Sequence, residues 1–246
     1  MTIAFDHFVL LVDDLDIAAR DFQALGFTVL DRADTSHGST VFKFVSFADG
    51  AYILLTAFTS AEGRKGHRLG PVMDAGEGWA DYSFVVPDAA AAGAALTARG
   101  FATRGPVPVS NVLADGARWG LDLLMTGRGA GGDPALPFLV SDAEGRGHRI
   151  PGPSTHANGA SGIASATVAA ADPRAVANAL IAMGGREIPG GPGIRVSFGA
   201  VHVDVQGLDA PGSRPGGGLS AVMLRGGVAP LDPALIHGAP MFFTGE

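Results

Sequence analysis

Apolar and polar positions follow the same order three times along the chain. Each time, an apolar strand-like run leads after seven residues to an aspartate and after twelve more to a glycine. Because self-similarity at a fixed period marks a repeated structural unit, the spacing predicts three copies of one strand–helix module. The marker positions are His7, Asp14 and Gly26; Asp81, Asp88 and Gly100; and Ser165, Asp172 and Gly184.

The three aspartates and the three glycines mark the two ends of a helix in each module. An aspartate before a helix accepts a hydrogen bond from a backbone N–H that the first turn leaves without a partner. A glycine after it adopts the left-handed conformation that closes many helices. Apolar residues recur at helical spacing between them, as at Ala18, Phe22 and Leu25. We therefore expect helices over residues 15–25, 89–99 and 173–183.

Alternating stretches after each helix predict further strands. The clearest are residues 40–47 and 51–56, which flank a turn and form a predicted hairpin. Residues 27–30 are interpreted as a short strand, and the Pro- and Val-rich stretch after residue 104 as a loop. The predicted fold class is α+β, built from repeated βαβββ modules. The expected boundaries are a first module over 1–59, a linker over 60–77, a second module over 78–142, a linker over 143–160, a third module with an extra C-terminal strand over 161–225, and a tail over 226–246.

Composition narrows the classes of partner. The 246 residues carry a net charge of −7 without a run of Lys or Arg, which argues against nucleic acid and anionic membranes as partners. The absence of Cys excludes disulfides, thiolate nucleophiles and Cys-ligated zinc. Neither a signal peptide nor an apolar run long enough to span a membrane is present, so we expect a cytoplasmic protein.

Repeated βαβββ modules that open with Asp-His, an apolar run and Asp-Leu resemble the vicinal oxygen chelate superfamily, which comprises glyoxalases, bleomycin-resistance proteins and extradiol dioxygenases. Three segments are similar to glyoxalase-like domain proteins of that superfamily: DHFVLLVDDLDIAARDFQALGF, LPFLVSD and HANGASGI. The resemblance covers roughly residues 4–206. It implies that paired modules curl into a cup, with curved sheets lining a site and helices outside.

The resemblance also implies where metal-dependent members hold their ion, on the first and last strands of each paired module. Those positions carry His7 and Asp81 on the first strands, and Leu54 and Phe138 on the last. The last two cannot ligate, whereas catalytic metal sites generally use three protein ligands. We therefore expect no cofactor and no metal in the usual four-ligand site. His7 and Asp81 are the fallback ligands of a divalent ion. A third ligand would then come from Asp122, His156, His202 or Asp204.

Without a metal, His7 and Asp81 are predicted to form an acid/base pair across the cup. The carboxylate would orient the imidazole and raise its pKa above the reference value of about 6.5. Arg118 either faces solvent or anchors a substrate carboxylate or enolate, and it completes the catalytic candidates. The substrate-binding candidates are Tyr52, Leu54, Phe138, His156 and Asn158, while His37, His67 and His148 are interpreted as surface residues.

Three functions remain open at this point. The first is a glyoxalase-like enzyme, of lyase or isomerase type, that acts on a small, oxygenated and partly apolar metabolite by acid/base chemistry. The second is a small-molecule binding or resistance protein that sequesters its ligand without a metal. The third is a metal-dependent lyase or dioxygenase with a non-standard ligand set. All three imply a small-molecule partner, and a homodimer is compatible with each.

Overall fold

Strands and helices alternate through residues 3–245, the part of the chain that the computed structural model describes. Residues 1 and 2 of the first predicted module and residue 246 of the predicted tail lie outside it. The helices are α1 (Leu15–Ala24), α2 (Ala61–Lys65), α3 (Gly70–Met73), α4 (Ala89–Thr97), α5 (Arg146–Arg149) and α6 (Pro173–Ala182). The strands are β1 (Ala4–Leu11), β2 (Thr40–Ser46), β3 (Tyr52–Phe58), β4 (Gly78–Val85), β5 (Arg104–Val112), β6 (Arg118–Met125), β7 (Phe138–Glu144), β8 (Ala160–Ala170), β9 (Arg186–Ile188), β10 (Ile194–Phe198), β11 (Val201–Gly207), β12 (Gly218–Gly226) and β13 (Met241–Phe243).

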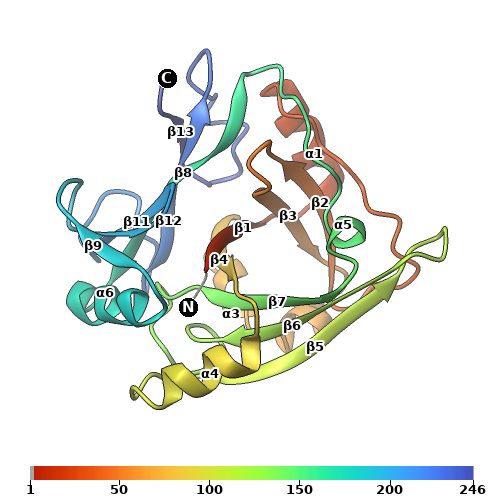
Figure 1. The fold of residues 1–246 in the computed structure, drawn as a ribbon. Helices are drawn as coiled ribbons and strands as arrows, with labels where there is room; N and C mark the ends of the chain where they lie inside the picture. The colour runs from red at the N-terminus through yellow and green to blue at the C-terminus, as the bar shows by residue number, and fades with distance from the viewer. Residues whose placement is uncertain (1–2, 246) are drawn as a thin grey trace.

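The first two modules share one curved sheet, with strand order β2-β3-β1-β4-β7-β6-β5. Within each module the first strand runs parallel to the last, as β1 does to β3 and β4 to β7. The two first strands, β1 and β4, pair antiparallel and join the modules edge to edge (Figure 1). The first strands of the two modules therefore lie next to each other in the middle of the sheet.

The third module forms a second sheet with strand order β13-β12-β8-β11-β10-β9. Here too the first strand, β8, runs parallel to the last, β11. Strand β12 pairs antiparallel with β8, and β13 runs parallel to β12. This is the pairing rule of the complete modules, so β12 and β13 correspond to the first and last strands of an incomplete fourth module. The predicted tail supplies β13.

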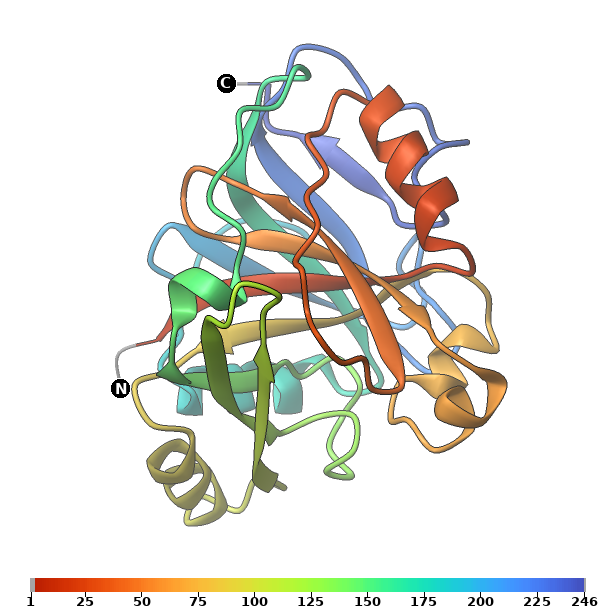
Figure 2. The ribbon, with the colours of Figure 1, turned by 90° about the vertical axis from the view of Figure 1, so that its right-hand side faces the viewer.

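The long helices α1, α4 and α6 lie against the convex faces of the two sheets, away from the concave face of the cup (Figures 1 and 2). Each begins where the sequence predicts, because the side chains of Asp14, Asp88 and Asp172 accept hydrogen bonds from the first-turn N–H groups of α1, α4 and α6. The α+β fold class, with curved sheets and helices outside, is therefore confirmed.

The two sheets pack against each other through a shared apolar core. Phe84 of β4 contacts Phe198 of β10 with ring centroids 4.4 Å apart, and the indole N–H of Trp79 donates to the carbonyl of Pro240 at 3.0 Å. A separate apolar cluster lies on the opposite, concave face of the seven-stranded sheet and includes Val9, Leu121 and Phe138. The first core joins the sheets, and the second cluster surrounds the cavity described below.

Two segments differ from the sequence-based expectation. Residues 27–30 make only a single bridge, between Leu30 and Phe44. The Pro- and Val-rich stretch expected as a loop belongs to β5, which is the edge strand of the sheet and, among the described strands, pairs with β6. Proline is tolerated there because an edge strand needs backbone donors on one side only. Since β5 is mostly exposed, it also lacks the apolar alternation that marks a half-buried strand.

Within residues 3–245, no helix combines the length and the apolar character that crossing a bilayer requires.

Gly26 ends α1 and is also where the connector between the second and third modules approaches the first module. Its φ is 84°, and a Cβ there would lie 2.9 Å from the backbone nitrogen of Asn158. Asn158 donates from its backbone N–H to the carbonyl of Gly26 and from its side chain to that of Leu25. The close approach and the left-handed conformation both require glycine.

We expect Gly26→Ala to destabilise the protein more than Gly50→Ala does. Gly50 has nearly the same φ, 83°, but a Cβ added there meets no atom of residues 3–245 within 4 Å. Gly50→Ala should therefore lower the free energy of unfolding by the left-handed strain alone, about 1–2 kcal/mol. Gly26→Ala should cost about 1–3 kcal/mol more, because Asn158 must move. Urea denaturation measures both, and equal losses would contradict the assigned contact.

Candidate functional site

A cavity of about 180 Å³ opens on the concave face of the seven-stranded sheet. Strands of the first and second modules supply its walls, which are mostly apolar, and the connecting segments add charged groups. The apolar lining residues are Val9, Phe42, Phe44, Leu54, Leu69, Val109, Trp119, Leu121, Leu123, Phe138 and Val140. The polar lining residues are His7, Arg32, Thr40, Tyr52, Thr56, His67, Arg68 and Arg149.

A β-bulge in β1 places Asp6 and His7 side by side. The pairing of β1 with β4 shifts register between Phe5 and His7, so Asp6 is an extra residue in the strand. Neighbouring side chains of a regular strand point to opposite faces, and a bulge changes this direction locally. As a result, Nδ1 of His7 lies 2.8 Å from Oδ2 of Asp6, and both side chains are buried.

Asp6 is ionised in this arrangement. Burial alone would raise its pKa, but the hydrogen bond from His7 and the charges of Arg149 and Arg146 outweigh burial and hold the pKa of Asp6 well below its usual range. A carboxylate only accepts hydrogen bonds, so the shared proton lies on Nδ1 of His7. This leaves Nε2 as the unprotonated nitrogen of the neutral ring, and Nε2 has no hydrogen-bond partner within residues 3–245.

The ring of His7 is buried, and this lowers its pKa even though Asp6 acts to raise it. The expectation of a raised pKa is therefore wrong, because burial penalises the imidazolium more than the carboxylate favours it. The ring stacks on Tyr52 with centroids 4.6 Å apart and meets the ring of Phe138 edge-on at 5.3 Å. These contacts fix the orientation of a neutral imidazole at the wall of the cavity.

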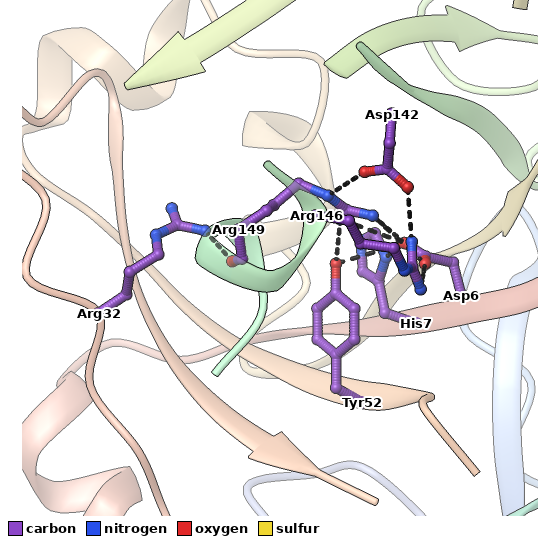
Figure 3. A network of polar contacts seen from close by, with 7 residues as sticks. All are labelled: Asp6, His7, Arg32, Tyr52, Asp142, Arg146 and Arg149. Carbon is purple, nitrogen blue, oxygen red and sulfur yellow. Dashed lines mark hydrogen bonds and ion pairs between the residues drawn. The ribbon is translucent and has the colours of Figure 1, made fainter. Parts of the chain in front are cut away.

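Arg149 ties the His7 region to the connector between the second and third modules (Figure 3). It is buried, and it donates to Asp6, to Oδ1 of Asp142 at 2.7 Å and to the hydroxyl of Tyr52 at 2.8 Å. Arg146, one helical turn earlier on α5, donates to Asp6 and Asp142 at 2.8 Å each. Burial raises the pKa of Tyr52, so its hydroxyl stays neutral and donates to Asp6 at 3.3 Å. The two carboxylates and two guanidinium groups balance in charge.

Arg68 and His67 reach the cavity from the segment over 60–77, which was expected to be a linker. Arg68 forms an ion pair with Asp81 and lies over the ring of Phe138, 4.7 Å from its centroid. The other carboxylate oxygen of Asp81 accepts from the backbone N–H of Tyr82 at 2.8 Å. The predicted pairing of His7 with Asp81 is thus corrected, because His7 pairs with Asp6 and Asp81 pairs with Arg68.

His67 lines the cavity and is not the surface residue that its glycine-rich context suggests. Its Nδ1 accepts from the backbone N–H of Leu69 at 3.2 Å, so in the neutral ring the proton lies on Nε2. Burial and the charge of Arg68 lower the pKa of His67 and favour this neutral form. The cavity therefore has two neutral imidazoles of opposite tautomer, His7 as an acceptor and His67 as a donor.

Tyr52, Leu54 and Phe138 line the cavity, as expected, whereas Arg118 does not. Its side chain is 67% exposed and lies 3.7 Å from the carboxylate of Glu144. The cavity face of β6 instead carries the alternating residues Trp119, Leu121 and Leu123. This corrects the placement of Arg118, since strand alternation turns it to the opposite face of the sheet.

His156 and Asn158 lie outside the cavity, which corrects their expected position as well. His156 is buried between Phe27 and Phe47, accepts from the N–H of Thr28 at 3.0 Å and donates to the carbonyl of Ser46 at 3.2 Å. Both of its ring nitrogens are therefore used in attaching the connector to the first module. Asn158 donates to the carbonyl groups of Leu25 and Gly26 at the C-terminal end of α1.

The donors present do not fit a divalent ion. His7 offers one nitrogen, and the oxygens of Asp81 already accept hydrogen bonds from Arg68 and Tyr82. Within residues 3–245 there is no group of three or more His, Asp or Glu side chains placed to hold a metal. The further ligand candidates do not lie in the cavity: Asp122 does not line it, and His202 and Asp204 belong to the second sheet, where Arg195 binds Asp204.

The residues that sequence reasoning missed are Asp6, Arg149, Arg68 and His67. Asp6 carried a usable signal, because a carboxylate directly before a histidine at the start of a strand can pair with it through a bulge. The other three belong to connectors, where no periodicity relates a residue to a particular strand. Only the tertiary structure brings them to the cavity.

Comparison with known proteins agrees with this architecture. A family model described as a glyoxalase-like domain matches residues 5–184. A hypothetical protein from Staphylococcus aureus is similar in structure, with 14% identity, a TM-score of 0.73 and 98% of each chain covered. A mutant of 4-hydroxymandelate synthase from Streptomyces coelicolor has 14% identity and a TM-score of 0.53, and the alignment covers 90% of this chain and 70% of that one.

A fusion of a xylose isomerase-like TIM barrel with 4-hydroxyphenylpyruvate dioxygenase has 15% identity and a TM-score of 0.53, and the alignment covers 92% of this chain and 37% of that one. No curated protein matches. At these identities the structural likeness concerns the fold. Together with the family model, it confirms the resemblance drawn from the repeated modules.

Proposed function

The chain belongs to the glyoxalase-like domain family, and from this premise we propose that it is an enzyme that moves a proton on a small, partly apolar carbonyl compound. The observation that carries the proposal is the buried pair of Asp6 and His7, with Nδ1 and Oδ2 2.8 Å apart. It provides an oriented neutral imidazole at the wall of a largely apolar cavity. Such a group is suited to remove a proton from carbon next to a carbonyl.

In the proposed reaction, Nε2 of His7 takes the proton and the ring becomes an imidazolium. Asp6 stays ionised and stabilises that cation through the hydrogen bond at Nδ1. Stacking on Tyr52 and the edge contact with Phe138 keep the ring from turning during the transfer. Returning the proton to a neighbouring atom gives an isomerase, and expelling a leaving group gives a lyase. A general base of this kind contributes about 10²–10⁴-fold to the rate.

The negative charge that develops on the substrate oxygen needs a hydrogen-bond donor. His67 lines the same cavity and carries its proton on Nε2, because its Nδ1 accepts from Leu69. The N–H of a neutral imidazole can donate a hydrogen bond to an enolate oxygen, as the neutral electrophilic histidine of triosephosphate isomerase does. We assign this oxygen-stabilising role to His67.

Solvent exchange with simple carbonyl compounds tests the proposal. The wild-type protein in D₂O should accelerate deuterium incorporation next to the carbonyl of phenylacetone or 3-methyl-2-oxobutanoate, followed by proton NMR. His7→Gln keeps a polar side chain of similar reach but removes the base, and we expect it to lose about 10²–10⁴-fold of the accelerated rate. His148→Gln, which changes an exposed histidine of α5, is the control and should keep the rate.

Equal exchange by wild type and His7→Gln would overturn the assignment of His7. Binding of these compounds without any acceleration would favour the alternative function, a binding or resistance protein. The predominantly apolar lining of the cavity, which would also suit a protein that only binds its ligand, supports this alternative.

A further inference from the structure

Three arginines line the cavity, and they differ in how many of their nitrogens are already bonded. All three side-chain nitrogens of Arg149 donate to Asp6, Asp142 or Tyr52. Those of Arg32 donate to the carboxylate of Asp34 and to the carbonyl of Arg149. A guanidinium in this state has little left to offer a ligand, so these two arginines hold the cavity together.

Arg68 is different, because only its Nη1 has a hydrogen-bond partner within residues 3–245, namely Asp81. Its Nε and Nη2 remain, and in an arginine these two nitrogens form one edge of the planar group. Two parallel N–H donors on such an edge match the two oxygens of a carboxylate. The side chain is 15% exposed and lines the cavity.

We propose that Arg68 is the carboxylate-binding group of this cavity, and that its ligand is a small monocarboxylate with an apolar body. This assignment concerns where the ligand binds. It rests on the proposed function only for the reaction that the ligand then undergoes. It adds a substrate class: the carboxylate lies on the free edge of Arg68, and the remainder of the molecule occupies the apolar part of the cavity.

The cavity sets the size and nature of that body. Leu121, Leu123 and Val140 supply aliphatic wall, while Phe138 lies beneath the guanidinium. A volume of about 180 Å³ is comparable to the engineered apolar cavity of about 150 Å³ that binds benzene. It therefore suits one aromatic ring or a branched aliphatic chain with a short acidic arm.

The position of Arg68 explains why the donors do not fit a metal. Its guanidinium contacts Asp81 and Phe138, which are two of the four positions at which the family resemblance implies metal ligands. A cation that belongs to the chain thus occupies this part of the cup. It offers fixed positive charge to an anionic oxygen, and its partner Asp81 stays buried beneath it.

Calorimetric titration with phenylacetate and with its neutral counterpart 2-phenylethanol tests the proposal. Wild type should bind phenylacetate more tightly than the alcohol. Arg68→Gln should weaken phenylacetate binding at least about tenfold and leave the alcohol unchanged, since a hydrogen bond to a charged group is lost. Asp81→Asn should have the opposite effect and tighten phenylacetate binding, because the guanidinium no longer shares its charge with a second carboxylate. A purely structural role would weaken binding in both variants.

Arg118→Gln is the matched control, because it removes an exposed arginine on the opposite face of β6 and should not alter either affinity. If Arg68→Gln unfolds because Asp81 is left unpaired, the double variant Arg68→Gln/Asp81→Asn removes both charges and should still lack the preference for phenylacetate. A preference for phenylacetate in a folded variant without Arg68 would overturn the proposal, as would equal binding of both probes by wild type.

His7→Gln separates this proposal from the proposed function. It should keep phenylacetate binding while losing proton exchange. Retained binding together with absent exchange in wild type would overturn only the catalytic assignment, whereas exchange by a protein indifferent to Arg68 would overturn only the carboxylate site.

Discussion

Asp6→Asn is expected to lower the rate of proton transfer by about 10³-fold while the protein stays folded. The amide no longer stabilises the imidazolium that forms at His7. It can also present its NH₂ group to Nδ1, which would move the ring proton to Nε2 and block the base. Deuterium exchange in D₂O measures the loss. Asp122→Asn is the control, since Asp122 does not line the cavity, and it should leave the rate unchanged.

The pH dependence of the exchange rate is a second measurement that tests the pairing of Asp6 with His7. Protonation of His7 abolishes the base, so the rate falls as the pH drops through the pKa of His7. Because burial lowers this pKa, the acid limb of the wild-type profile should lie below the ordinary histidine value of about 6.5. The carboxylate of Asp6 acts to raise the pKa, so any residual activity of Asp6→Asn should have its limb at still lower pH. A limb above 6.5, or one that moves upward in the variant, would contradict the Asp6–His7 assignment.

Arg149→Met is expected to reduce the free energy of unfolding by about 3–5 kcal/mol, the usual cost of removing one partner from a buried ion pair. Arg149 is 3% exposed and bonds to Asp6, Asp142 and Tyr52, so its loss removes the donor to Oδ1 of Asp142 and leaves less positive charge beside the buried carboxylate of Asp6. Arg146 binds the same two carboxylates but is 39% exposed. Arg146→Met is therefore the matched control and should cost about 1 kcal/mol or less. Urea denaturation compares the two, and similar losses would argue against the central place of Arg149.

Acid should narrow the difference in stability between wild type and Arg149→Met. The pKa of Asp6 is held far below its value in the unfolded chain, about 3.9. Its ionised form therefore stabilises the fold above that pH, and this contribution is lost progressively as the pH falls below about 4. The stability gap between the two proteins, measured by urea denaturation at a series of pH values, should be constant near neutrality and narrow below pH about 4. A gap that widens in acid would mean that Asp6 is not the carboxylate that Arg149 stabilises.

The sequence by itself determined where the three long helices begin and most of the strands that line the cavity, although β5, which contributes Val109, was expected as a loop. Helix boundaries follow from local chemistry, since Asp14, Asp88 and Asp172 cap helices that begin within a few residues of them. Strand faces follow from period-two alternation, which is why Tyr52 and Leu54 were correctly expected in the cavity. These features depend on neighbours in the chain, so a pattern of residues is enough to predict them.

The tertiary structure alone decided which polar groups meet at the site. His7 was expected opposite Asp81, but a one-residue bulge gives it Asp6 as a partner instead. Arg68 and Arg149 come from connectors that approach the cavity by packing against it, and strand alternation alone did not settle on which face Arg118 lies. The pKa of His7 likewise depends on burial by residues far away in the sequence. Register, connector paths and burial are set by long-range packing, and a local pattern carries no information about them.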